Sequence, residues 1–131
     1  MTVKEFNEGR DKFIARMIEI LDTKGPDYSN SDDRLANFKR LAQLLGTTPL
    51  QIWAVYAMKH MDAIMTYAKS GKVASEEITG RFLDLANYAV LGAALVQEAQ
   101  YRAKNTPAPL PVFVEVPKPF EHVPPWLVPK P

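Results

Sequence analysis

Apolar residues recur at helical spacing through most of the first 105 positions of the chain. In residues 3–23 they fall every three or four positions, as on one face of an amphipathic helix, and Thr2 is placed to cap that helix. Residues 24–31, KGPDYSNS, then gather residue types that stop helices and favour turns. The pattern therefore predicts a first helix followed by a loop that carries Tyr28.

A second helix is predicted after this loop. Ser31 is placed as its N-cap, and Asp32 and Asp33 follow in the first turn, where the helix dipole favours negative charge. Gly46 is expected to end it. One apolar stripe runs along this segment, formed by Leu35, Phe38, Leu41, Ala42 and Leu45.

The third and fourth helices carry clear end signals. A capping box with proline at the first helical position predicts a third helix over residues 49–70, and its residues are Thr48, Pro49 and Gln51. Ser75 is expected to cap the fourth helix, which runs toward Lys104. Because the connection is short, these two helices are predicted to be antiparallel neighbours. The fold class expected is all-α, with a four-helix bundle-like domain over residues 1–105.

The composition changes at Thr106. Nine of the eleven prolines follow it, which excludes helix and favours extended or polyproline II backbone over residues 106–131. One interpretation is a floppy terminus. The other is an arm that packs on a neighbouring subunit, because the segment also holds more apolar side chains than disordered chains usually do, including Phe113, Phe120 and Trp126. We expect the arm, and with it a homo-oligomer.

Charge and composition exclude several classes of protein. Lys and Arg number 16 against 15 Asp and Glu, so the chain lacks the overall field that attracts nucleic acid or anionic membranes. No apolar run approaches the roughly 18 to 20 residues of a membrane span. There is no cysteine, and the start of the chain, MTVKEFNEGRDKF, is too charged for a secretory signal peptide. A cytoplasmic protein is expected.

The stretch LAQLLGTTPLQIWAVY has the spacing of a repressor-type helix-turn-helix. A DNA-reading helix needs several hydrogen-bonding side chains and phosphate-binding cations in its first turns. Here those turns offer only Gln51 among mostly apolar residues. A tight turn between packed helices explains the same spacing, so DNA binding is not expected.

Charged residues stand among the apolar positions of the third and fourth helices. If the turn between them is centred near residue 73, Asp62 lies opposite Asp84 and Lys59 lies opposite Asn87, with Arg81 one turn away. These groups form either an ion-pair network that fixes the helix register or a cleft in which carboxylates hold Mg²⁺ and cations meet phosphate. His60 is a possible general base, but with no obvious nucleophile nearby a structural histidine is the more common case.

Four segments together, TKGPDYSN, LANFKRLAQLLG, MKHMDAI and SEEITGRFLDLANYAVL, resemble a family of small helical proteins common in phages and prophages, labelled a nucleotide modification associated domain. That family is similar to the all-α MazG-like nucleoside triphosphate pyrophosphohydrolases. The resemblance covers residues 20–98. It gives weight to scattered positions: Lys24, Asp27, Tyr28, Asn37, Phe38, Lys59, Glu76, Arg81, Asp84 and Asn87.

The chain departs from the MazG-like pattern in its carboxylates. Those enzymes use several glutamates on two helices to hold Mg²⁺ against a triphosphate. Here the stretch expected to face Asp84 reads YAMKHMD, in which Asp62 is the single acid. At most three carboxylates can converge in this sequence, supplied by Asp62, by Glu76 or Glu77, and by Asp84.

The resulting hypothesis is a protein that binds a nucleotide, or another small molecule carrying phosphate, between the third and fourth helices and the Tyr28 loop. Lys24, Lys59 and Arg81 would contact phosphate, with Asn87 beside them, and Tyr28 or Phe38 would stack on a base. Asp62, Glu76 and Asp84 would hold Mg²⁺ and carry catalysis if the nucleotide is hydrolysed. Binding alone and pyrophosphohydrolysis both stay open at this point. The alternative is a non-catalytic interaction protein that docks a host or phage partner through its arm.

Overall fold

The computed structural model describes residues 1–29, 32–72 and 77–106, and these residues form an all-α, bundle-like fold without strands. The predicted fold class is therefore confirmed. The described part of the chain contains no helix both long and apolar enough to cross a membrane. The proline-rich arm falls on residues 107–131, outside the described residues, and its predicted role stays a prediction. The helices are α1 (Val3–Tyr28), α2 (Ala36–Leu45), α3 (Pro49–Ser70) and α4 (Ile78–Asn105).

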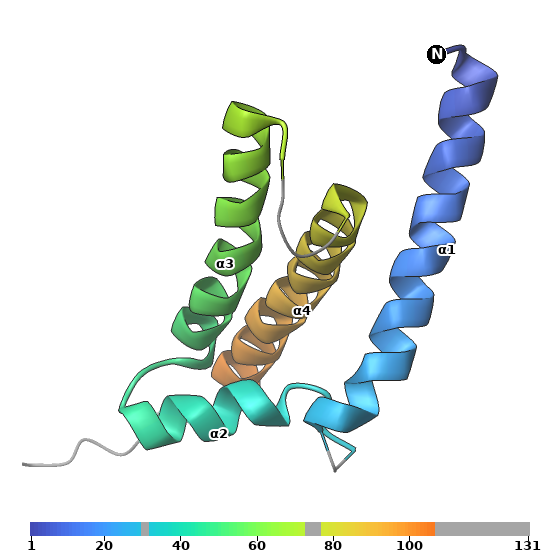
Figure 1. Ribbon diagram of the computed structural model, residues 1–131. Helices are drawn as coiled ribbons and strands as arrows, with labels where there is room; N and C mark the ends of the chain where they lie inside the picture. Colours follow the sequence, from blue (N-terminus) through green and yellow to red (C-terminus); the bar gives the residue numbers. More distant parts are fainter. Residues whose placement is uncertain (30–31, 73–76, 107–131) are drawn as a thin grey trace, which may run out of the picture.

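Helices α3 and α4 pack side by side and antiparallel, as predicted, while α2 crosses beneath them and α1 flanks α4 (Figure 1). The core lies where α2, α3 and α4 meet, and Trp53 packs at its edge and donates a hydrogen bond of 2.6 Å from Nε1 to the carbonyl oxygen of Tyr88. The first half of α1 extends past the start of α4 (Figure 1) and leaves apolar side chains such as Phe6 and Ile14 exposed. The buried core residues are Leu35, Phe38, Ala42, Ile52 and Leu95.

The ends of α3 follow the sequence signals. Thr48 Oγ1 accepts a hydrogen bond of 3.2 Å from the backbone N–H of Gln51, and the Gln51 side chain accepts one of 3.1 Å from the Thr48 N–H. Gly71 ends the helix with a φ of 67°, in the left-handed region that favours glycine. The capping box and the stop signal predicted for this helix are confirmed.

The loop predicted over residues 24–31 is wrong in its first part, because α1 continues through Tyr28. Proline removes one helical hydrogen bond, and it disfavours a helical conformation in the preceding residue by clashes with that residue's backbone N–H and Cβ. Gly25 precedes Pro26 and has no Cβ, so the helix passes through this pair. Gly25 is also buried, and packing of this kind overrides local propensity.

The starts of α2 and α4 also differ from prediction. Helix α2 begins at Ala36, and Asp33 Oδ1 accepts a hydrogen bond of 2.9 Å from the Leu35 N–H just before it. The predicted cap Ser31 lies outside the described residues, as does the predicted cap Ser75 of α4, whose N-cap is Glu77. An acidic residue can accept hydrogen bonds from the free N–H groups of a helix start from more than one position. The residue types alone therefore did not fix the first residue of either helix. Leu45 is 67% exposed and does not belong to the core stripe.

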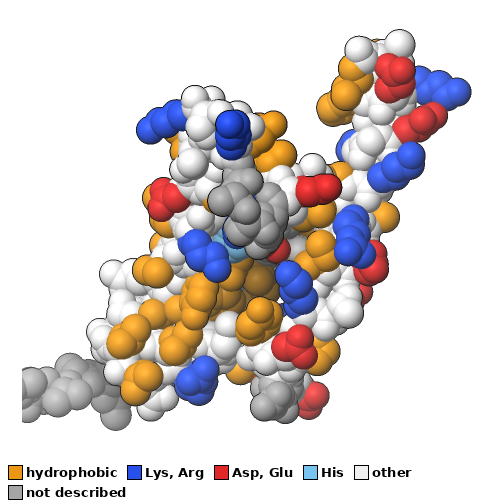
Figure 2. Space-filling model, viewed as in Figure 1, with side chains coloured by type: hydrophobic (Ala, Val, Ile, Leu, Met, Phe, Trp, Pro, Cys, Tyr) orange, Lys and Arg blue, Asp and Glu red, His pale blue; other side chains and the backbone are white. Residues whose placement is uncertain are grey.

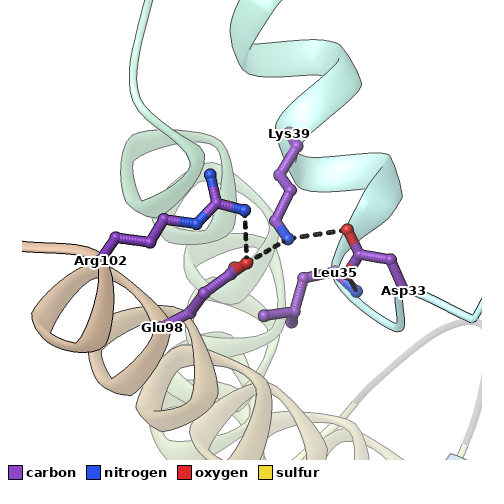
Figure 3. Close-up of polar contacts among 5 residues, drawn as sticks. All are labelled: Asp33, Leu35, Lys39, Glu98 and Arg102. Carbon is purple, nitrogen blue, oxygen red and sulfur yellow. Dashed lines mark hydrogen bonds and ion pairs between the residues drawn. The ribbon is translucent and has the colours of Figure 1, made fainter. Parts of the chain in front are cut away.

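Lys39 links the start of α2 to the second half of α4 (Figure 3). Its Nζ lies 2.7 Å from Asp33 Oδ2 and 2.6 Å from Glu98 Oε1, and Arg102 Nη2 lies 2.7 Å from the same Glu98 oxygen. The hydrogen bond from Lys39 lowers the pKa of both carboxyl groups. Burial opposes the charge on Lys39, but its hydrogen bonds to the two carboxylates outweigh burial and raise its pKa. The network therefore stabilises the ionised forms of all three groups.

This network predicts a sensitivity to acid. The Asp33 and Glu98 pKa values are lowered on folding from 3.8 and 4.5, so their contribution to stability is full above those values and is lost as the pH falls through the lower folded-state values. Lys39→Met is expected to reduce the free energy of unfolding at pH 7 by about 1 kcal/mol, because the partners are partly exposed and solvent screens them. Chemical unfolding at pH 7 and below pH 4 measures both effects.

The matched control is Lys12→Met, an exposed lysine on the projecting half of α1. The Lys39 variant should lose less stability than the parent between pH 7 and acid, since it lacks the charge that lowered the carboxyl pKa values. Equal acid sensitivity in the parent and the Lys39 variant would contradict the assignment of this effect to the network.

Candidate functional site

A pocket of about 320 Å³ lies where the end of α1, the start of α2 and the facing sides of α3 and α4 come together. On the face seen in Figure 2, Lys and Arg side chains stand on both sides of a hydrophobic area in the middle of the molecule. The pocket is lined by basic side chains and by aromatic and other apolar side chains. Its basic members are Lys24, Arg34, Lys59 and Arg81, its aromatic members are Tyr28, Phe38, Tyr56 and Tyr88, and its other polar members are Asn37, His60, Asp84 and Asn87.

Helical spacing brings these residues to one place. On α3, Tyr56, Lys59 and His60 are three or four positions apart, so they share a face of the helix. On α4, the lining residues from Arg81 to Leu91 recur every three or four positions in the same way. The continuation of α1 to Tyr28 adds a third wall, which would be missing if the helix stopped near residue 23.

Asp84 is the one carboxylate among the described lining residues. Its Oδ2 lies 3.4 Å from His60 Nδ1, and its Oδ1 lies 3.8 Å from Lys24 Nζ. The Asp84 side chain is 20% exposed and that of His60 is 7% exposed, so this pair is largely withdrawn from water. An aspartate in this apolar helix is therefore compensated by a cation from α1 and an imidazole from α3.

The register of α3 against α4 differs from the prediction by two residues. Asp84 faces His60 where Asp62 was expected, and Asp62 is exposed and absent from the pocket wall. The contact that sets this register is further down the helices, where a Cβ on Gly92 would lie 2.7 Å from Cε2 of Trp53. The bulky indole fits only opposite a residue without a side chain, and this contact fixes which residues of α3 and α4 face each other. The prediction had instead paired residues at equal distances from an assumed turn centre at residue 73.

Most of the predicted site residues meet in the pocket. The wall contains Lys24, Tyr28, Phe38, Lys59, Arg81, Asp84 and Asn87, together with Asn37. Asp62 and Asp27 are exposed and do not line it. Glu76 lies outside the described residues, so its predicted role as a metal ligand stays a prediction. Lys59 and Asp84 lie on the same seam, which the hypothesis of a shared cleft required.

The aromatic residues form a continuous surface. The rings of Tyr56 and Tyr88 are nearly parallel, with an interplanar angle of 8° and centroids 6.3 Å apart, and Phe38 meets Tyr56 edge to face at 6.2 Å. The His60 ring lies 5.2 Å from that of Tyr88. Burial is the main cause that raises the pKa of Tyr88, so its hydroxyl stays protonated at neutral pH.

Asn87 presents a polar group that the described residues leave unpaired. The residue is 6% exposed and lines the pocket, and its Oδ1 has no hydrogen-bond partner among the described residues. Buried amides are usually satisfied, and one that is not commonly receives a donor from water or a ligand. Its place in the wall makes it a candidate acceptor for a donor group of the bound molecule.

Sequence reasoning missed Arg34 and undervalued His60. It placed Tyr56 and Tyr88 on facing sides of the third and fourth helices but did not include them among the site residues. A Cβ on Gly25 would overlap the Arg34 guanidinium at Nη1, so this arginine lies directly on the α1 backbone. Helical spacing could not predict this contact, because the sequence analysis placed a loop between Gly25 and Arg34. The sequence did hold a signal for His60 and Tyr88. A glycine inside an apolar helix indicates close approach of a bulky residue, and placing Gly92 of α4 against Trp53 of α3 also brings Tyr88 close to His60.

The donor set does not resemble a magnesium site built from several carboxylates. Within residues 1–29, 32–72 and 77–106, no group of three or more His, Cys, Asp or Glu side chains is arranged to hold a metal ion. The resemblance to the nucleotide modification associated family rests on the residues quoted from the sequence. Comparison of the chain with family models, with curated proteins and with solved structures found no significant match.

Proposed function

We propose that this protein binds a nucleotide in the pocket between α1, α3 and α4. The observation that carries the proposal is the composition of the wall, in which four basic side chains and four aromatic rings surround a space of about 320 Å³. Pockets for small molecules begin at roughly 300 Å³, so the space suits one mononucleotide-sized ligand. An anionic group and a flat apolar group on the same ligand match the two kinds of lining.

The phosphate end of the ligand would lie among Lys24, Arg34, Lys59 and Arg81. Arginine binds phosphate oxygens through two parallel N–H bonds, and lysine acts as a mobile point charge. These cations come from different parts of the chain. Lys24 lies in α1 and Arg34 in the segment before α2, while Lys59 lies in α3 and Arg81 in α4. A phosphate group would be a common partner for these cations, in addition to the ion pair that Lys24 makes with Asp84.

The base would lie against the aromatic surface. A ring of Tyr56 or Tyr88 offers a flat face of the kind on which bases stack, and such stacking contributes about 1–3 kcal/mol per base. Phe38 is only 2% exposed and supports Tyr56 from the core. Asn87 Oδ1 would then accept a hydrogen bond from an exocyclic amine or a ring N–H of the base. Tyr28, which is exposed at the rim, would cover the ligand from the α1 side.

Binding is better supported than hydrolysis. The described lining supplies one carboxylate, Asp84, whereas the pyrophosphohydrolases that the sequence resembles use several. His60 beside Asp84 is a group that can accept a proton, so an assay for released phosphate or pyrophosphate accompanies the binding experiment. Docking of a protein partner through the arm stays the alternative, and it concerns residues outside the described ones.

The test is titration calorimetry and thermal unfolding of the full chain with nucleoside mono-, di- and triphosphates. At least one nucleotide should bind, and Lys59→Gln should weaken its binding by about tenfold, because glutamine keeps a neutral donor and loses only part of the contribution of a charged hydrogen bond, about 1.5–3 kcal/mol. Lys69→Gln is the matched control, because Lys69 lies on the same helix, is exposed and does not line the pocket. Absence of binding and of any rise in melting temperature across the panel would refute the proposed function.

A further inference from the structure

The acidic residues of the pocket are unlike those that hold a divalent ion next to phosphate. Asp84 is the one carboxylate of the described wall, and both of its oxygens already face partners, Lys24 Nζ at 3.8 Å and His60 Nδ1 at 3.4 Å. Asp62 and Glu77 are exposed and do not line the pocket. Mg²⁺ keeps near-octahedral oxygen coordination and binds through carboxylates and waters, and neither Lys24 nor protonated His60 can serve as a ligand.

The charge around Asp84 also opposes a divalent cation. With His60 neutral, the described wall carries four positive side chains and one negative one. A doubly charged cation placed there would meet repulsion from Lys24, Arg34, Lys59 and Arg81 that a single carboxylate does not cancel. The same side chains match the charge of about −1.5 to −2 on a phosphate monoester or the somewhat larger charge of a diphosphate.

We infer that the pocket binds a nucleoside mono- or diphosphate directly through its basic side chains, without a bound divalent ion. This inference rests on the proposed function and specifies the ligand and the way its phosphate is held. It departs from the Mg²⁺ site that the resemblance implies, because the described donors do not fit that ion. A triphosphate, which carries more charge and is usually handled together with Mg²⁺, is the less suitable ligand.

Arg34 makes this arrangement specific. Its guanidinium lies against the backbone at Gly25, in space that any side chain at that position would occupy. A guanidinium held in this way presents several N–H donors in a fixed plane, which matches phosphate geometry. Lys24 comes from the adjacent residue of the same helix, so the end of α1 and the segment before α2 supply half of the positive charge.

Calorimetry of the full chain tests the inference. Adenosine, guanosine, cytidine and thymidine mono- and diphosphates are titrated once in excess EDTA and once in millimolar Mg²⁺. The dissociation constant of the best ligand should differ by less than about threefold between the two conditions. Binding that appears only with Mg²⁺ would overturn the inference and leave the proposed function standing, while no binding in either condition would remove the proposed function itself.

Asp84→Asn gives a second test, because the direction of the change in affinity shows whether Asp84 competes with the ligand for Lys24 or holds a metal ion. If Asp84 competes with the ligand for Lys24, removing its charge should raise affinity in EDTA by a few-fold, roughly 2- to 10-fold. If Asp84 holds a metal, the variant should lose binding in Mg²⁺, and that result would overturn the inference. Asp62→Asn is the matched control, because this exposed carboxylate of α3 is absent from the wall.

Discussion

Gly25→Ala is expected to weaken nucleotide binding by about ten- to a hundredfold while the protein remains folded. The new Cβ would overlap Nη1 and Cζ of Arg34, so the guanidinium must leave its position in the pocket. It is the far end of a flexible side chain and can move into solvent, so the main cost to the fold is the clash of the new Cβ with Pro26, which should loosen the last turn of α1. Titration calorimetry measures the affinity, and circular dichroism measures the melting temperature.

Two further variants separate Arg34 from the helix itself. Arg34→Gln removes the guanidinium without changing Gly25, and it should reproduce most of the loss in affinity. Gly9→Ala adds a methyl group to the same helix at a position with nothing within 4 Å, so it should leave binding unchanged and stabilise α1 by about 0.5–1 kcal/mol. If Gly25→Ala binds as tightly as the parent, Arg34 does not hold the ligand from this position.

Gly92→Ala is expected to destabilise the protein by about 2–4 kcal/mol, the largest effect on folding that we predict. Its Cβ would lie 2.7 Å from Cε2 and 2.9 Å from Nε1 of Trp53, inside van der Waals distance. The indole is large and packs against the core, so it can move only by separating α3 from α4 or by breaking its 2.6 Å hydrogen bond to the Tyr88 carbonyl. Chemical unfolding followed by tryptophan fluorescence measures the change.

A Trp126→Phe background makes Trp53 the sole tryptophan, so the fluorescence reports on this contact. Trp53→Phe provides the test of mechanism, because a smaller ring leaves room for the new methyl group. Gly92→Ala should therefore be much less destabilising in the Trp53→Phe protein than in the parent, as a double-mutant cycle would show. Additive effects of the two substitutions would indicate that the methyl group disturbs something other than the indole.

The elements of this fold were largely visible in the sequence. The apolar periodicity located all four helices, and the capping box at Thr48 with the glycine at position 71 fixed both ends of α3. Signals of this kind are local, since a cap bonds N–H groups within three residues of itself. The errors at the starts of α2 and α4 arose where several acidic or hydroxyl residues in a row offered alternative caps.

The sequence predicted many of the residues that line the pocket, but it did not predict which of them face each other. Lys24, Lys59, Arg81 and Asp84 were singled out because charged side chains inside apolar helices need partners. Their actual partners depended on distances through space. Asp84 faces His60 and Lys24, and Asp62, two residues from His60, points elsewhere and is exposed.

The sequence alone determined the helical class, the helix ends that carry local caps, and the identity of most charged residues and half of the aromatic residues in the pocket. Tertiary structure decided the register of α3 against α4, the passage of α1 through Pro26, and the position of Arg34. The physical reason is the same in each case. A side chain such as the Trp53 indole or the Arg34 guanidinium fits only where a distant glycine leaves room, and that complementarity exists between elements and not within any one of them.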